Sequence, residues 1–134
     1  MNDFNLEIGM AKETQTRVTE KNIATEYGSS SVKVFGTPAM VALMEESAAK
    51  AVDKYLPEGF ATVGIHLDIK HIAATPIGMN VTANAKLAGI DGKKLFFDVE
   101  ASDEKEKIGS GTHQRYIIEL DKFLEKVEEK NKHC

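Results

Sequence analysis

The sequence predicts an α+β domain in which a curved antiparallel sheet wraps one long central helix. Three observations carry this prediction. A long helix-forming run follows Pro38, four runs of alternating apolar and polar residues follow residue 60, and no helical run separates those four. Parallel strands need a crossover of about a dozen residues, usually helical, so the sheet is expected to be antiparallel. With 134 residues, the whole chain, 1–134, is expected to form a single domain.

The first predicted strand covers residues 7–20, where the alternation is weak but β-branched residues are frequent. These residues are Thr14, Thr16, Val18 and Thr19. Residues 21–28 are expected to form a short irregular or helical piece. A serine cluster at 29–31 predicts a mobile loop before the short apolar stretch 32–35.

The long helix is predicted from Gly36-Thr37-Pro38 to Tyr55. Threonine is a good N-cap, and proline is tolerated at the first helical position. Residues 39–44 are apolar on every face, so the first two turns are expected to be enclosed. From Glu45 onward the run is amphipathic, with a buried side of Ala48, Ala51, Val52 and Tyr55 and a solvent side of Glu46, Lys50, Asp53 and Lys54.

Four further strands are predicted over residues 62–75, 80–90, 93–103 and 108–119. The inward residues of the first three are Val63, Ile65, Leu67 and Ile69, then Val81, Ala83, Ala85 and Leu87, then Leu95, Phe97, Val99 and Ala101. From Leu120 the chain is expected to form a charged tail helix, whose inner face holds Phe123, Leu124 and Val127.

A few apolar residues fall outside the inward register of these strands. They are Phe96, Ile117, Ala73 and Ala74. Exposed apolar positions on the edge or face of a sheet favour association with another chain. A homodimer that covers them is therefore expected.

The composition excludes several classes of function. Seventeen basic and twenty-one acidic side chains give a net charge of −4, which leaves no positive surplus for binding nucleic acid. The single cysteine, Cys134, allows neither an intramolecular disulfide nor a structural zinc site and suits the reducing cytoplasm, where we expect the protein. No apolar window reaches the length of a membrane span, and residues 1–20 are not expected to be a leader peptide.

Thr37 and Glu45 are candidate catalytic residues, and each also has a simpler structural interpretation. Thr37 could serve only as a helix cap. Glu45 follows the enclosed turns, where a carboxylate is costly unless it is paired, so it either lines a cavity or turns to solvent with Glu46. Two adjacent glutamates cannot both face inward on a helix, so one of them is expected at the surface.

His71 is the third candidate. It has the same parity as Ile69, which places its ring on the apolar side of the strand if no bulge intervenes. A lone inward histidine is more often structural than catalytic. His113 lies near Gly109 and Gly111, where missing side chains let a ligand approach, and is a weaker alternative. No set of histidines and carboxylates has the spacing of a metal site.

Four segments occur in a recognisable order. They are VFGTPAMVALMEE at 34–46, TVG at 62–64, HIAATP at 71–76 and IGSGTHQR at 108–115. In this order and at these separations they resemble the hotdog-fold thioesterases related to fluoroacetyl-CoA thioesterase, over almost the whole chain. The resemblance implies a hotdog fold and a dimer formed through the sheet.

The resemblance also implies the chemistry. Thr37, Glu45 and His71 align with the catalytic threonine, glutamate and histidine of the family. Gly64 aligns with the glycine whose backbone amide helps to hold the thioester carbonyl, and Arg115 falls at a position used near the active site. Glu45 would act as a base or as a transient nucleophile, His71 would pass a proton to the departing thiolate, and Thr37 would orient the reacting atoms. No metal or other cofactor is required.

One segment departs from the family. The specialised fluoroacetyl-CoA members carry a phenylalanine-rich lid before the long helix, whereas residues 26–31 read EYGSSS. The expected substrate is therefore a general short-chain acyl-CoA, hydrolysed at or near a dimer interface. Two alternatives stay open. One is a non-catalytic acyl-CoA binding module of the same fold, and the other is a hotdog enoyl-CoA hydratase, whose Asp and His motif is not found in this sequence.

Overall fold

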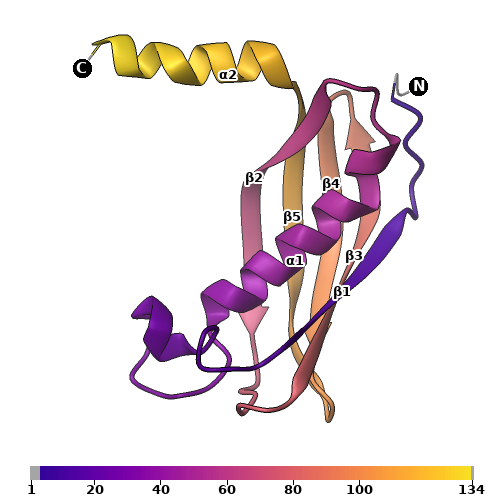
Figure 1. The fold of residues 1–134 in the computed structure, drawn as a ribbon. Helices are drawn as coiled ribbons and strands as arrows, with labels where there is room; N and C mark the ends of the chain where they lie inside the picture. Colours follow the sequence, from indigo (N-terminus) through magenta and orange to yellow (C-terminus); the bar gives the residue numbers. More distant parts are fainter. Residues whose placement is uncertain (1–3, 134) are drawn as a thin grey trace.

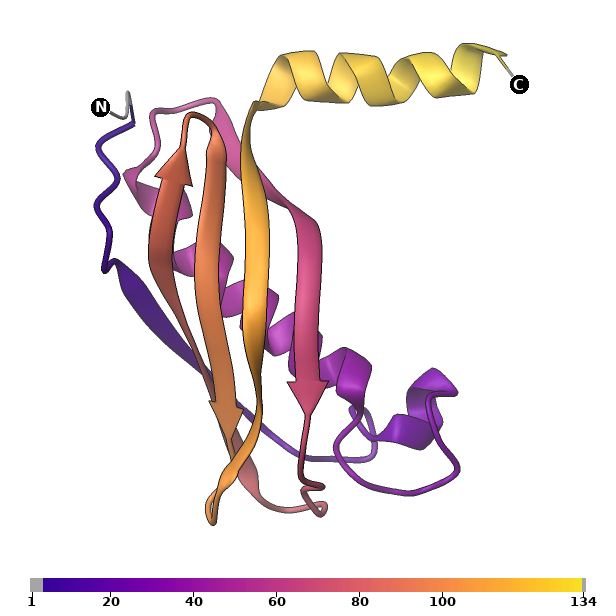
Figure 2. The same cartoon turned by 180° about the vertical axis from the view of Figure 1, so that it is seen from behind.

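The computed structural model describes residues 4–133 and confirms the α+β prediction. Five antiparallel strands form one curved sheet in the order β1-β3-β4-β5-β2, and helix α1 lies across its concave face (Figures 1 and 2). The strands are β1 Ala11–Arg17, β2 Phe60–His71, β3 Asn80–Asp91, β4 Lys94–Ser102 and β5 Lys107–Glu119. The helices are α1 Thr37–Val52 and α2 Leu120–Glu129, with short 3-10 segments η1 Ala24–Tyr27, η2 Asp53–Tyr55 and η3 Lys130–His133.

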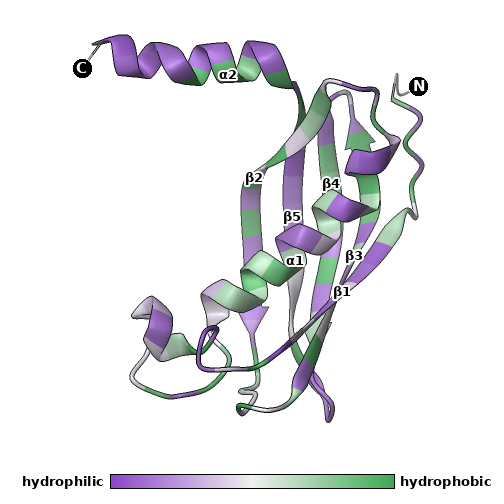
Figure 3. Cartoon of the chain, viewed as in Figure 1, coloured by the Kyte–Doolittle hydropathy of each residue, from purple (hydrophilic) through white to green (hydrophobic). Residues whose placement is uncertain are grey.

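The apolar core lies between α1 and the sheet. Met40 and Met44 on α1 are fully buried, in one cluster with inward residues of the strands such as Leu95 and Phe97. All the residues predicted to face inward on β3 and β4 are buried, and Figure 3 shows the alternation along these strands. Each large apolar side chain contributes about 1.5–3 kcal/mol when fully buried, so this layer fixes α1 on the sheet.

The start and the solvent side of α1 differ from the prediction. Gly36 is the N-cap, and Thr37 is the first helical residue, so the prediction that Thr37 caps the helix is wrong. Residues 39–44 are only partly enclosed, since Ala42 is exposed, and Tyr55, expected to be buried, is also exposed. The sheet covers α1 from one side only. Because alanine is apolar but small enough to be tolerated at the surface, the apolar run in the sequence does not show which side of the helix is exposed.

Strand β2 contains a β-bulge between Gly64 and His66, which the parity argument for His71 had assumed to be absent. Residues directly opposite each other in an antiparallel pair lie on the same face of the sheet. Before the bulge, Gly64 lies opposite the buried Arg115 and faces α1. After the bulge, the ring of His71 reaches Thr37 on the same helix. The predicted inward orientation of His71 is therefore confirmed.

The bulge changes the orientation of the first residues of β2. Val63 lies opposite the exposed Tyr116 and therefore on the outer face, so its predicted inward orientation is wrong. Ile65, within the bulge, is largely exposed. One extra residue reverses the parity of the strand on one side of it, and strict alternation does not reveal where that residue lies.

Strand β5 turns polar side chains toward α1. His113 is fully buried and Arg115 is 7% exposed, and Ile117 on the same face is buried in the core. The prediction that Ile117 lies outside the inward register is therefore wrong, because the inward face of β5 is marked by an imidazole and a guanidinium rather than by apolar residues. The other residues expected outside the register are half-buried or exposed: Phe96, Ala73 and Ala74.

Helix α2 leaves the domain at the end of β5 and extends past the open edge of β2 (Figure 1). None of its residues is buried. The side chains expected on its inner face are exposed: Phe123, Leu124 and Val127. The prediction that α2 packs an inner face against its own chain is therefore wrong. The main contact of α2 with the sheet is the end of β5, from which the helix leaves.

Candidate active site

Thr37 and His71 form a hydrogen-bonded pair at the start of α1. The Oγ1 atom of Thr37 lies 2.7 Å from Nδ1 of His71, which is the last residue of β2. The other ring nitrogen, Nε2, is buried and has no hydrogen-bond partner within residues 4–133. Burial lowers the pKa of His71, while the nearby backbone of Ala73 opposes the change. The imidazole is therefore neutral at neutral pH and able to accept a proton.

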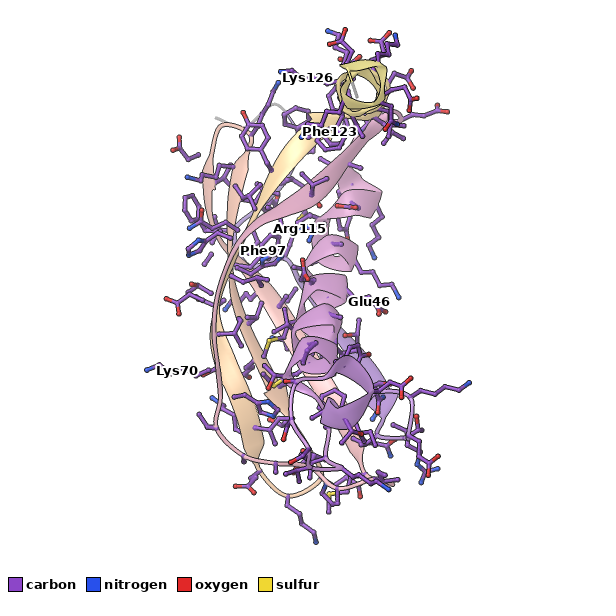
Figure 4. All side chains as sticks on the ribbon, turned by 90° about the vertical axis from the view of Figure 1, so that its left-hand side faces the viewer. Glu46, Lys70, Phe97, Arg115, Phe123 and Lys126 are labelled. Atoms are coloured by element: carbon purple, nitrogen blue, oxygen red, sulfur yellow. The ribbon has the colours of Figure 1, made fainter. Side chains whose placement is uncertain are left out.

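Glu45 lies two turns further along α1 and faces the sheet. A methyl group added at Gly64 on β2 would come within 2.8 Å of its Oε2 atom, so the missing side chain of Gly64 makes room for the carboxylate. The neighbouring Glu46 is exposed and forms a 2.8 Å ion pair with Lys50. Figure 4 shows Glu46 on the side of α1 away from the sheet. Glu45 therefore faces the sheet and does not turn to solvent with Glu46.

Arg115 lies between the sheet and α1 (Figure 4), opposite Gly64 in the register of β2 and β5. Its Nε donates to Oγ1 of Thr62 at 2.8 Å, and its Nη2 donates to the carbonyl of Thr62 at 2.9 Å. Its Nη1 lies 3.2 Å from Nε2 of His113, whose Nδ1 lies 2.8 Å from the carbonyl of His66. A carbonyl can only accept, so the proton of His113 is on Nδ1, and Nε2 accepts from Arg115.

The charges in this cluster compensate one another in part. Burial lowers the pKa of Arg115, and the carboxylates of Asp53 and Glu45 oppose that change. Burial also lowers the pKa of His113, the His66 carbonyl opposes it, and the positive charge of Arg115 adds to it. Arginine remains charged in proteins, so a buried cation faces Glu45 while the histidine beside it stays neutral.

The five predicted site residues form two groups within one chain. Thr37 meets His71, whereas Glu45 meets Gly64 and Arg115. Eight residues of helix separate the two groups on α1, or about 12 Å. Seven residues of strand separate them on β2, or roughly 20 Å. A single chain therefore does not bring the hydroxyl, imidazole and carboxylate to one point.

The second group also contains His113, Thr62 and Asp53. Of these three, the sequence indicated only His113, as a weaker candidate. The signal for His113 was its position beside Gly109 and Gly111. Cβ atoms at these two glycines would come within 3 Å of neighbouring atoms, so β5 packs unusually closely here. Nothing in the spacing of Thr62 and Asp53 pointed to Arg115, because the contacts join different elements.

The described residues show no metal centre and no membrane span. No three of their His, Cys, Asp or Glu side chains lie close enough together to hold a metal ion. None of the helices in this part of the chain is long and apolar enough to cross a bilayer. The side chains of the site supply a carboxylate, an imidazole, a hydroxyl and a buried guanidinium, a set that suits hydrolysis of an acyl bond.

One long helix across a five-stranded curved sheet is shared with solved hotdog proteins. A hot-dog-like protein from Thermanaerovibrio acidaminovorans superposes with a TM-score of 0.87 at 23% identity, over 96% of each chain, which shows the fold. A thioesterase superfamily member from Thermus thermophilus gives a TM-score of 0.86 at 25% identity, over 96% of this chain and 97% of that one. Fold and site together define a hotdog protein of the thioesterase class.

Within the thioesterase class, the chain is assigned to one family. The family model for fluoroacetyl-CoA-specific thioesterases matches residues 18–121, and the chain belongs to that family. The fluoroacetyl-CoA thioesterase of Streptantibioticus cattleyicolor is 43% identical over 98 residues, which are 73% of this chain and 70% of that protein. A solved structure of a fluoroacetyl-CoA thioesterase has a TM-score of 0.87 at 35% identity, over 94% of this chain and 98% of that one. Variants of that enzyme have been solved with acetyl-CoA and with fluoroacetate.

Proposed function

We propose that this protein hydrolyses a short-chain acyl-CoA thioester to the free acid and CoA. The observation that carries the proposal is the Glu45 carboxylate, held beside Gly64 and a buried guanidinium on a chain that belongs to a thioesterase family. The related protein is a fluoroacetyl-CoA thioesterase, and a variant of such an enzyme has been solved with acetyl-CoA. Both support a small acyl group on CoA as the substrate.

The roles of the groups follow from their chemistry. Glu45 either takes a proton from the attacking water or attacks the acyl carbon itself, in which case water then cleaves the acyl-enzyme anhydride. The amide of Gly64 and the charge of Arg115 stabilise the negative charge that develops on the carbonyl oxygen. His71 delivers a proton to the departing thiolate, and Thr37 fixes the imidazole through Nδ1.

A homodimer completes the site in this proposal. The edge strand β2 has twelve residues with one side unpaired within the described chain, and α2 extends past the same edge. Twofold dimers bring the same surface of both chains together. If β2 pairs antiparallel with its own copy so that Gly64 lies near the partner's His71, the carboxylate group of one chain meets the imidazole pair of the other.

The acyl preference is proposed to be general rather than fluoroacetyl-specific. Tyr27 and the three serines 29–31, which precede α1, are exposed, and residues 26–31 contain no phenylalanine. With no phenylalanine-rich segment at this position, acetyl-CoA and fluoroacetyl-CoA are expected to be cleaved at similar rates.

Thiol release from a panel of acyl-CoA esters tests this function. Wild type is expected to cleave acetyl-CoA and propionyl-CoA, and Glu45→Gln is expected to lower kcat by about 10²- to 10⁴-fold. Glu46→Gln is the matched control, since it alters the adjacent exposed glutamate, and it is expected to keep the wild-type rate.

Two outcomes contradict the proposal. Binding of acyl-CoA by calorimetry without thiol release would favour the non-catalytic module, and hydration of crotonyl-CoA without thiol release would favour the hydratase. Equal rates for Glu45→Gln and wild type would remove Glu45 from the mechanism.

A further inference from the structure

Four side chains behind Glu45 form one continuous chain of hydrogen bonds. We call Asp53, Thr62, Arg115 and His113 the Arg115 network. They come from η2, β2 and β5, and the network joins the end of α1 to the interior of the sheet. The hydroxyl of Thr62 lies 2.6 Å from Oδ1 of Asp53, and the remaining links are the contacts of Arg115 with Thr62 and His113 described above.

The protons in the Arg115 network have one possible arrangement. Oγ1 of Thr62 accepts from Arg115, so its own proton points to the Asp53 carboxylate. Nδ1 of His113 donates to the His66 carbonyl, so Nε2 must accept from Arg115. The bonds of Thr62 to Asp53 and to Nε of Arg115 depend on an intact Thr62 hydroxyl, the contact at Nη1 depends on a neutral His113, and the bond from Nη2 uses the Thr62 carbonyl. The guanidinium is thus held at all three of its nitrogen atoms.

Burying the Arg115 network costs free energy of folding. Thr62 and Arg115 are each less than a tenth exposed, and His113 is fully buried. Replacing buried charged groups with apolar side chains of similar size is often neutral or stabilising. Stability alone therefore gives no reason for a guanidinium at this position, and its neighbour across Gly64 is Glu45: a methyl group there would lie 2.8 Å from Oε2 and 3.5 Å from Nη1.

We propose that Thr62 and His113 are positioning residues that hold the Arg115 guanidinium beside Gly64, where its positive charge orients the Glu45 carboxylate for reaction. The inference rests on the proposed role of Glu45. Misplacing a catalytic group by about 1 Å can lower the rate about 100-fold, so a neighbouring guanidinium that is itself held in place can have a large effect on kcat through its charge.

Matched threonine variants test the proposal. Thr62→Val removes the hydroxyl of the Arg115 network. Thr14→Val removes another buried hydroxyl on β1, at the opposite edge of the sheet, which donates to the carbonyl of Leu43. Both variants are expected to lower Tm by about 4 °C. Only Thr62→Val is expected to lower kcat, by about 10- to 100-fold, with KM changed less than about twofold.

Conservative rescue separates positioning from packing. Thr62→Ser keeps the hydroxyl and is expected to retain a rate near that of wild type. The proposal is overturned if Thr62→Val keeps the wild-type kcat, if Thr62→Ser is as slow as Thr62→Val, or if Thr14→Val loses kcat to the same extent.

A measurement without activity distinguishes this proposal from the proposed function. Nitrogen NMR of wild type is expected to show His113 protonated at Nδ1 and unprotonated at Nε2, and a slowly exchanging Nε proton on Arg115 that Thr62→Val makes fast. A proton on Nε2 of His113 would overturn the arrangement even in an active enzyme. The expected spectra with no thioester hydrolysis would instead overturn the proposed function.

Discussion

The two ends of the site on α1 are built differently. At the first turn, Thr37 is exposed and His71 is half-buried, and a single hydrogen bond joins them while Nε2 of His71 lacks a partner within the described chain. At the third turn, Glu45 is backed by the buried Arg115, whose nitrogen atoms bind Thr62 and approach His113. At one end a buried ring nitrogen lacks a partner within the described residues, and at the other the carboxylate lies beside Gly64 with a buried cation near it.

This difference indicates how each end works. A guanidinium held at all three nitrogen atoms reorganises little during a reaction, which suits a residue that stabilises developing charge. A group with a free nitrogen can make its last contact with substrate or with a second chain. In the proposed function, one chain therefore preorganises the carboxylate end, and substrate or the second chain completes the imidazole end.

The largest expected effect comes from complementation between two inactive variants, which tests whether the two ends of the site meet across a dimer. In the proposed dimer each site takes Glu45 from one chain and His71 from the other. Glu45→Gln and His71→Ala are each expected to lose at least about 100-fold in kcat. After subunit exchange of an equal mixture, half of the dimers hold both chains, and each of these has one intact site, so about a quarter of the wild-type activity returns.

The matched control for complementation is a mixture of Glu45→Gln with itself after the same exchange, which stays inactive. Native mass spectrometry of the mixture measures the fraction of mixed dimers. If mixed dimers form and activity stays at the level of the single variants, the two ends of the site do not meet across a dimer.

A smaller effect is expected from filling the space at Gly64. In Gly64→Ala the new methyl group would lie 2.8 Å from Oε2 of Glu45, so the carboxylate must shift, and kcat is expected to fall by about 10- to 100-fold. Gly89→Ala is the control, since Gly89 also adjoins a bulge and its nearest neighbour is the side chain of Phe96 at 3.3 Å. Steady-state kinetics of both variants check this, and equal rates would show that Glu45 has room to move.

The smallest effect concerns stability against pH. Burial lowers the pKa of His113, opposed by the His66 carbonyl and Glu45 and reinforced by Arg115. Below the unfolded value of about 6.5, the unfolded chain binds more protons than the folded one, so stability is full above that pH and is lost as the pH falls through the folded pKa. The urea midpoint is expected to be constant between about pH 7 and 8 and to decrease below about 6.5.

Two histidine variants assign this pH dependence. His113→Gln is expected to flatten the decrease in the urea midpoint below pH 6.5, although burial also lowers the pKa of His71, which leaves a smaller decrease. His66→Gln is the control, because its side chain is exposed and its backbone carbonyl stays in place. A decrease that His66→Gln removes and His113→Gln leaves intact would contradict the assignment.

The parts of the fold that sequence alone predicted are those with a regular pattern. Strict alternation over residues 80–90 and 93–103 identified the buried faces of β3 and β4, and the apolar run after Pro38 identified α1. The inward face of β5 was missed because it holds His113 and Arg115. A search for apolar periodicity does not detect polar side chains that are buried and hydrogen-bonded in the interior.

The amino-acid sequence by itself determined an antiparallel sheet around one helix, the family, and the candidates Thr37, Glu45 and His71. These follow from local periodicity and from residue order, which a linear chain records. Only the tertiary structure decided that Glu45 rather than Glu46 faces the sheet, that a bulge redirects β2, and that Arg115 binds Thr62 and approaches His113. Those outcomes depend on contacts between distant elements, where the free energy of pairing buried polar groups, not the pattern along the chain, selects the arrangement.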